Sequence, residues 1–202
     1  MSAAKIAAVI LAAGLSRRAG DRNKLLMPIK GEPIVRHPAR SAVEAGLEVH
    51  VVTGHQPDRI EAALAGLGVS RFTHNSDYGT GMGTSVAAGI MALPSSTDAA
   101  FIMLGDMPHI PASLLAEMVG VARKDDFEKI IVPIGKRGGE GGPMGNPILF
   151  PKHVFKDLET LKGDQGAKSL IKGNPDLIRS FDTNEPGIFV DYDTLEAFPD
   201  AG

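Results

Sequence analysis

Two aspartates at distant points of the chain have the side-chain type and the placement needed to hold a divalent cation. Asp106 comes just after the apolar run 99–104, and Asp191 comes just after the apolar run 188–190. Magnesium prefers one or two protein carboxylates, with phosphate oxygens and water as its other ligands. Asp106 could equally be a turn or helix-cap residue. Only a fold that joins the ends of the two runs could bring both carboxylates to one site.

Asp193 offers a further carboxylate close to Asp191. Residues i and i+2 of an extended segment face the same way, roughly 6.6 Å apart, so the two side chains could share one metal–phosphate site. The segment 193–196 (Asp-Thr-Leu-Glu) also fits a variant capping box in which Asp193 begins a helix. Asp191 is therefore the preferred ligand, while Asp193 is either a ligand or a cap.

A loop of small and basic residues follows the first apolar run. Residues 11–20 read Leu-Ala-Ala-Gly-Leu-Ser-Arg-Arg-Ala-Gly, and Lys24 comes shortly after. The pattern is neither GxGxxG nor GxxxxGK[ST], so it supports neither a dinucleotide fold nor a P-loop. Small residues let backbone N–H groups approach an anion, and Arg18 and Lys24 add positive charge. The loop's composition fits a triphosphate site and a tight turn with solvated arginines equally well.

Residues after two further predicted strands could contact the same ligand. Thr53 and Gly54 follow the second strand and could line a base pocket or form a simple turn. Gly81 opens a helix whose free N–H groups could bind an anion, and Ser85 could add a hydroxyl. Asn75 could orient the loop before that helix. The alternative is a capped surface helix without a ligand.

Short apolar runs alternate with amphipathic stretches along the chain, which predicts strands and helices in alternation. We expect strands at 5–11, 49–53, 71–74, 99–104, 130–133, 147–150, 178–181 and 188–190. We expect helices at 32–45, 58–67 (capped by Asp58), 82–93, 111–123, 158–171 (broken at 163–166) and 194–198. This order predicts an α/β fold with three layers (α/β/α) around a doubly wound, mostly parallel sheet. Ligands of such sheets bind at the carboxyl ends of the strands, where the candidate residues lie.

Composition excludes several classes of protein. The chain has 202 residues, no cysteine, a net charge of −3 and 5% aromatic residues without tryptophan. These values exclude disulfides and thiolate metal sites, and they disfavour nucleic acid as a partner. The apolar run 6–14 is too short to span a bilayer, which needs about 20 residues. We therefore expect a single-domain cytoplasmic protein over 1–202 with no membrane or nucleic-acid partner.

The arrangement L-A-A-G-x-S-x-R-x-G…K-L-L resembles the signature of the MobA-like nucleotidyltransferases, and within them the molybdenum cofactor cytidylyltransferase group. The likeness extends in order to five more motifs: Asn75…Gly81-Met82-Gly83-Thr84-Ser85, Gly105-Asp106-Met107-Pro108, Gly145-Asn146-Pro147-Ile148-Leu149-Phe150, Gly163-Asp164-Gln165-Gly166-Ala167-Lys168 and Asp191-Tyr192-Asp193-Thr194. The chain departs from the pattern at Ala19, where methionine is common, and at Asn146, where histidine is frequent. The stretch 138–142 is also unusually rich in glycine.

The resemblance implies a Rossmann-like nucleotidyltransferase fold and a reaction. The enzyme would transfer a nucleoside monophosphate from a nucleoside triphosphate to the terminal phosphate of molybdopterin, with Mg²⁺, and release pyrophosphate. Ala13 stands where guanylyltransferases tend to have a second glycine, which favours CTP over GTP. Such a protein could also contact a molybdoenzyme or its chaperone. The alternatives are GTP as donor, another phosphorylated acceptor, or a delivery protein that binds nucleotide or cofactor without turnover.

The resemblance also assigns roles to residues. Residues 1–134 would form the nucleotide-binding half and 135–202 the acceptor-binding half. The expected nucleotide-binding residues are Leu11, Ala12, Ala13, Gly14, Ser16, Arg18, Lys24, Thr53, Gly54, Asn75, Gly81 and Ser85. The expected acceptor-binding residues are Asn146, Asp164, Gly166 and Lys168, although the segment 163–168 could also be a helix break with solvated charge. Arg18, Lys24 and Asp106 would be catalytic, and Asp106 and Asp191 would bind the metal.

Overall fold

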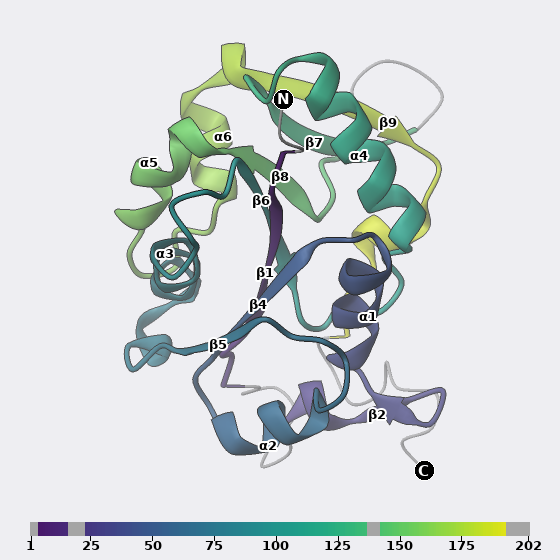
Figure 1. Cartoon of the computed structure of the whole chain (residues 1–202), viewed down its shortest axis with the longest axis vertical. Helices are drawn as coiled ribbons and strands as arrows, with labels where there is room; N and C mark the ends of the chain where they lie inside the picture. Colours follow the sequence, from purple (N-terminus) through teal and green to yellow (C-terminus); the bar gives the residue numbers. More distant parts are fainter. Residues whose placement is uncertain (1–3, 16–22, 137–141, 193–202) are drawn as a thin grey trace.

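A seven-stranded sheet forms the centre of the protein, in the order β5-β4-β1-β6-β8-β7-β9 (Figure 1). The computed structural model describes residues 4–15, 23–136 and 142–192. The strands of this sheet are β1 (Ile6–Ala12), β4 (Glu48–Thr53), β5 (Arg71–His74), β6 (Ala99–Leu104), β7 (Ile130–Gly135), β8 (Ile148–Pro151) and β9 (Ile178–Thr183). The α-helices are α1 (Arg36–Glu44), α2 (Pro57–Ala63), α3 (Met82–Met91), α4 (Ala112–Lys124), α5 (Phe155–Glu159) and α6 (Lys168–Gly173).

The sheet is mostly parallel, as the alternation of strands and helices predicts. β1 pairs in parallel with β4 and β6, β4 with β5, and β7 with β9. β8 runs the other way and pairs antiparallel with β6 and β7. The carboxyl ends of β5, β4, β1 and β6 therefore lie along one edge, and the amino end of β8 lies at the same edge.

Each face of the sheet has its own helices and its own apolar cluster. Residues of β1 alternate between the two: Ala8, Ile10 and Ala12 belong to the first cluster, and Ala7 and Val9 to the second. The first cluster also includes Ile34, Ile60, Leu115 and Met118, and the second also includes Val86, Ile90, Phe155 and Leu158. Helices α1, α2 and α4 thus cover one face, and α3, α5 and α6 the other. The expected three-layer architecture is confirmed.

Four local expectations are wrong. The segment 158–171 is not mostly helical, since α5 ends at Glu159 and α6 begins only at Lys168. Residues 188–190 are not a strand, because Pro186 begins a 3-10 helix, η6 (Pro186–Phe189). Asp58 does not cap α2; the cap position is Gln56, with Pro57 as the first helical residue. The first helix begins later than residue 32, since Glu32–Pro33 forms strand β3 and pairs with strand β2 (Pro28–Ile29) in a separate two-stranded sheet. The expected helix 194–198 lies outside the described residues.

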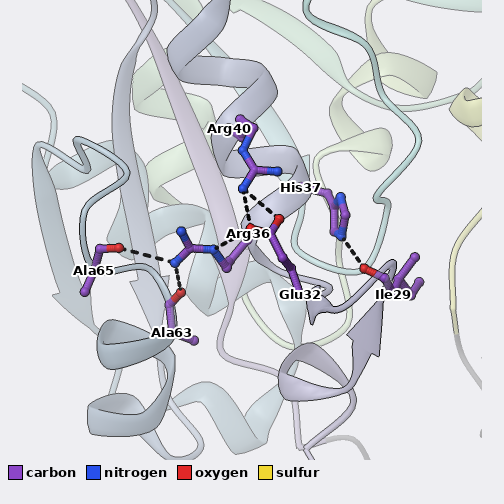
Figure 2. A network of polar contacts seen from close by, with 7 residues as sticks. All are labelled: Ile29, Glu32, Arg36, His37, Arg40, Ala63 and Ala65. Carbon is purple, nitrogen blue, oxygen red and sulfur yellow. Dashed lines mark hydrogen bonds and ion pairs between the residues drawn. The ribbon is translucent and has the colours of Figure 1, made fainter. Parts of the chain in front are cut away.

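Side-chain contacts hold this small β2–β3 hairpin against α1, and join α1 to the end of α2 (Figure 2). The Glu32 carboxylate pairs with the Arg40 guanidinium at 2.7 Å, and the Arg40 hydrogen bond is the main reason that the pKa of Glu32 is lowered. Arg36 donates to the carbonyls of Ala63 and Ala65 at the end of α2. These contacts fix the chain just after the Lys24 segment.

The helices of the described residues are all too short, or too polar, to cross a membrane.

Candidate nucleotide site

A cavity of about 330 Å³ opens at the carboxyl ends of β1 and β6. It is lined by residues from segments that are far apart in the sequence. The lining residues that the sequence predicts are Leu11, Ala13, Gly14, Lys24, Gly81, Ser85, Asp106 and Asp164. Those that the sequence analysis missed are Leu15, Leu25, Tyr78, Gly79, Met82 and Leu104. Ala12 is fully buried within β1 beside this cavity.

Lys24 and Asp106 form an ion pair in this cavity. The Lys24 Nζ lies 2.5 Å from the Asp106 Oδ2, and both side chains are largely buried, at 16% and 14% exposed. Lys24 begins the short 3-10 helix η2 (Lys24–Leu26), which the Asn23 side chain caps by accepting from the Leu25 N–H. Asp106 follows β6 after Gly105. Sequence analysis placed Lys24 on phosphate and Asp106 on metal; the fold puts the two groups in direct contact.

The Asp191 segment returns to Asp106 at the end of the described chain. The Tyr192 N–H donates to the Asp106 carbonyl at 3.2 Å, and the Tyr192 hydroxyl lies 2.9 Å from the His109 Nε2. Asp191 itself is exposed. Two aspartates that are remote in sequence thus lie on neighbouring backbone segments.

His109 is half-buried in this contact. Burial is the main cause that lowers its pKa, and the positive charges of Lys30 and His37 lower it further. Glu185 acts in the opposite direction. The imidazole is therefore held neutral to lower pH than a free histidine, as a partner for the Tyr192 hydroxyl.

Thr53, Gly54 and Asn75 support the cavity without lining it. Thr53 is fully buried, and Gly54 is also buried. The Asn75 Nδ2 donates to the hydroxyls of Thr84 and Ser85, each at 3.0 Å. Asn75 therefore fixes the first turn of α3, and its Oδ1 accepts from the Asp77 N–H in the loop before that helix.

A backbone carbonyl covers part of the amino end of α3. The Gly83 N–H donates to the Gly163 carbonyl at 2.8 Å, so this N–H is not free for an anion. Gly81 has a φ of +135°, and a Cβ there would lie 2.1 Å from the Gly163 carbonyl carbon. This close approach brings Asp164 to the rim of the same cavity as Lys24. The family resemblance instead predicts that Asp164 binds the acceptor.

The other three expected acceptor residues do not line this cavity. Gly166 lies near the Met82 sulfur, 3.6 Å from the position that a Cβ would take. Lys168 begins α6 and is half-buried. The Asn146 N–H donates to the Ile188 carbonyl at 3.0 Å, just before a cis Asn146–Pro147 bond. The residues that line the cavity include Asp164 but not these three.

Several predicted residues lie outside the described part of the chain. They are Ser16, Arg18 and Asp193. Within 4–15, 23–136 and 142–192, no group of three or more His, Cys, Asp or Glu side chains could by itself hold a metal ion.

A family model and several known proteins match most of this chain. The profile of the MobA-like NTP transferase domain matches residues 8–179. The purine catabolism protein PucB of Bacillus subtilis is 29% identical, over 94% of this chain and 92% of PucB. Nicotine blue oxidoreductase of Paenarthrobacter nicotinovorans is 26% identical, over 95% of this chain and 93% of that protein. The bifunctional protein GlmU of Francisella philomiragia is 30% identical over 83% of this chain, which spans 37% of GlmU.

Solved structures share the fold. Rv0371c from Mycobacterium tuberculosis superposes with a TM-score of 0.81 at 25% identity, covering 98% of this chain and 96% of that chain. A second structure of Rv0371c is a complex with manganese, at a TM-score of 0.71 and 23% identity, covering 90% and 89% of the two chains. Because the family model matches most of the chain, the chain belongs to the MobA-like NTP transferase family and is a nucleotidyltransferase.

Proposed function

We propose that the protein transfers CMP from CTP to the terminal phosphate of molybdopterin, with Mg²⁺, and releases pyrophosphate. The observation that carries this proposal is the Lys24–Asp106 pair, which lines the same cavity as Gly14. A cation beside a carboxylate, next to a loop of small residues, suits a ligand that brings both phosphate and metal.

The donor nucleotide would lie along the loop that follows β1. Gly14 and Leu15 line the cavity there, so their backbone is close to whatever fills it. Lys24 supplies a positive charge for the phosphates, and Arg18 remains a predicted second one. Ala13 also lines the cavity, and the resemblance to the family predicts that alanine at this position favours CTP over GTP.

The carboxylates of this chain fit a magnesium ion that brings phosphate ligands of its own. Asp106 lines the cavity, and the Tyr192–Asp106 backbone bond brings Asp191 to the same edge. Two carboxylates leave the remaining positions of an octahedral ion to phosphate oxygens and water. Manganese in the Rv0371c structure supports a divalent cation in this fold. When bound, Mg²⁺ would neutralise charge on the triphosphate.

The chemistry is an in-line displacement at the α-phosphorus. An oxygen of the acceptor's terminal phosphate forms a bond to the α-phosphorus, while the bond from that phosphorus to the bridging oxygen breaks and pyrophosphate leaves. The acceptor phosphate is already anionic, so no general base is needed. Lys24 would stabilise the charge that develops on the leaving pyrophosphate. In the structure described, Lys24 neutralises Asp106; nucleotide and cation together would give each group a new partner.

The acceptor would be bound by Asn146, Gly166 and Lys168, the predicted acceptor residues that are not among the lining of the nucleotide cavity. A molybdoenzyme or its chaperone remains a predicted partner for product delivery.

The test is pyrophosphate release with each of the four ribonucleoside triphosphates, with and without molybdopterin, in the presence of Mg²⁺. We expect release with CTP that depends on molybdopterin, and a product that contains both cytidine and the pterin. Release that prefers GTP, or that needs a different phosphorylated acceptor, would replace the proposed substrates and keep the reaction. Stoichiometric nucleotide binding without turnover would overturn the reaction itself in favour of a delivery protein.

A further inference from the structure

An aromatic side chain stands at the end of the cavity away from the charged pair. Tyr78 begins the short 3-10 helix η3 (Tyr78–Thr80), four residues after β5 ends. Its side chain is half-buried, packs against the second apolar cluster and lines the cavity. No motif in the sequence marks Tyr78, although it is one of only two tyrosines in a chain without tryptophan.

Gly54 makes room for this ring. A Cβ at position 54 would lie 2.6 Å from both the Cβ and the Cγ of Tyr78, and 2.9 Å from the Cβ of Ala13. Contacts this short do not occur between real side chains, so only glycine at 54 lets Tyr78 lie against the backbone that follows β4. The Tyr78 ring also stands beside His55, with 6.4 Å between ring centroids. The position of the Tyr78 ring is therefore fixed by the backbone at Gly54 and by the His55 side chain.

The order of the strands separates the aromatic end from the charged end. Tyr78 rests on Gly54, just past β4, and Asp106 lies just past β6. β1 lies between these two strands. Neighbouring strands are about 4.8 Å apart, so the two ends of the cavity are about 10 Å apart. One end holds a cation and a carboxylate, and the other holds an aromatic ring.

We propose that Tyr78 is the residue that stacks on the base of the bound nucleotide, and that Gly54 is the positioning residue that seats it. A nucleoside triphosphate has the same asymmetry as the cavity, with charge at one end and a flat aromatic base at the other. With the phosphates at Lys24, the base lies toward Tyr78. This inference rests on the proposed use of a nucleoside triphosphate and names the group that would hold its base.

Steady-state kinetics with CTP test the stacking. Base–aromatic stacking removed by substitution typically costs roughly tenfold to a hundredfold in affinity. We expect Tyr78→Leu to raise KM for CTP at least tenfold while kcat changes less than threefold, and Tyr78→Phe to keep KM within threefold. Phe72→Leu is the matched control, because Phe72 is half-buried on β5 but packs against the first apolar cluster, on the opposite face of the sheet. An unchanged KM in Tyr78→Leu would overturn the proposal.

Gly54→Ala tests whether Gly54 positions the Tyr78 ring. The added Cβ must displace the Tyr78 ring, so this variant should raise KM for CTP about as much as Tyr78→Leu does. In the double variant the two effects on KM for CTP should not add, because Gly54 has no ring to position once Tyr78 is replaced by leucine. Full additivity of the two effects on KM would show that Gly54 does not act through Tyr78.

Tyrosine fluorescence follows the ring directly, and it needs no variant at position 78. In Tyr192→Phe, Tyr78 is the only tyrosine left. We expect CTP to quench its emission, after correction with free N-acetyltyrosinamide at the same absorbance, at the concentrations at which calorimetry detects binding. Binding by calorimetry without quenching would overturn the role of Tyr78 and leave the proposed function intact. If no nucleoside triphosphate binds the unsubstituted protein, the proposed function fails, and this inference fails with it.

Discussion

The two ends of the sheet build different kinds of surface. In the parallel half, formed by β5, β4, β1 and β6, every strand ends at the same edge, and most of the cavity lining comes from this half. In the mixed half, β8 is antiparallel to both of its neighbours, β6 and β7. Asn146 therefore reaches the shared edge from the amino end of β8, whereas Lys152, just after β8, lies at the opposite edge beside Asp98. Residues that follow strands predict a site only where the strands are parallel.

Lys24 should have the largest effect of any single residue, because the parallel half is expected to hold the reacting phosphates. We expect Lys24→Ala to lower kcat by about 100-fold to 1,000-fold, the usual cost of losing a group that stabilises transition-state charge. Pyrophosphate release measures this effect. Lys129→Ala is the control: its ammonium binds the Asp176 carbonyl, and it is not among the residues that line the cavity. Near-normal kcat in Lys24→Ala would remove this lysine from the reaction.

Gly81 tests the contact that joins the two halves. In Gly81→Ala the new Cβ would meet the backbone of Gly163 and Asp164, and alanine would have to adopt a φ of +135°. We expect the free energy of unfolding to fall by about 3 kcal/mol. Urea denaturation measures the change.

Gly120→Ala is the matched control for this substitution. Gly120 lies within α4, and a Cβ there has no neighbour within 4 Å. Alanine in a helix interior should raise the free energy of unfolding by about 0.5 to 1 kcal/mol. Equal effects of the two substitutions would contradict the close packing at Gly81.

Asp164 distinguishes the two assignments of its segment. It lines the same cavity as Lys24. Asp164→Asn should therefore raise KM for the nucleotide about threefold to tenfold, because it weakens one hydrogen bond to the nucleotide. KM for the acceptor should stay within twofold. Steady-state kinetics with each substrate varied in turn measure both values. If only KM for the acceptor moves, the sequence-based assignment of Asp164 is right.

His109 should have the smallest effect, on stability near neutral pH. Its folded pKa is lowered, mainly by burial, so the unfolded chain takes up a proton first as the pH falls below the usual value of 6.5. Stability is therefore complete above that pH and is lost as the pH falls through the folded pKa. We expect His109→Gln to lose less stability than the unsubstituted protein between pH 7 and pH 5, in urea midpoints. Glu32, whose pKa is also lowered, titrates below this window. If both proteins lose the same stability between pH 7 and pH 5, His109 is not the cause of the pH dependence.

Sequence patterns predicted the elements well where one physical cause dominated. The run 99–104 is buried on both faces, and it is strand β6 with the bounds expected. The apolar run 188–190 was misleading, because Pro186 begins a helical turn there and the apolar side chain of Ile188 is buried in the first cluster. An apolar run indicates that its side chains are buried, and burial does not by itself distinguish a strand from a short helix.

The sequence by itself determined the layered α/β fold and the strand ends from which the site is built. Alternating apolar runs and amphipathic stretches can be read locally, since each element reflects its own residues. Only the tertiary structure decided which groups meet: Lys24 with Asp106, Tyr192 with the Asp106 backbone, and Tyr78 on Gly54. Such pairs depend on strand order and close backbone approach, which are set by the packing of the whole sheet rather than by any one segment.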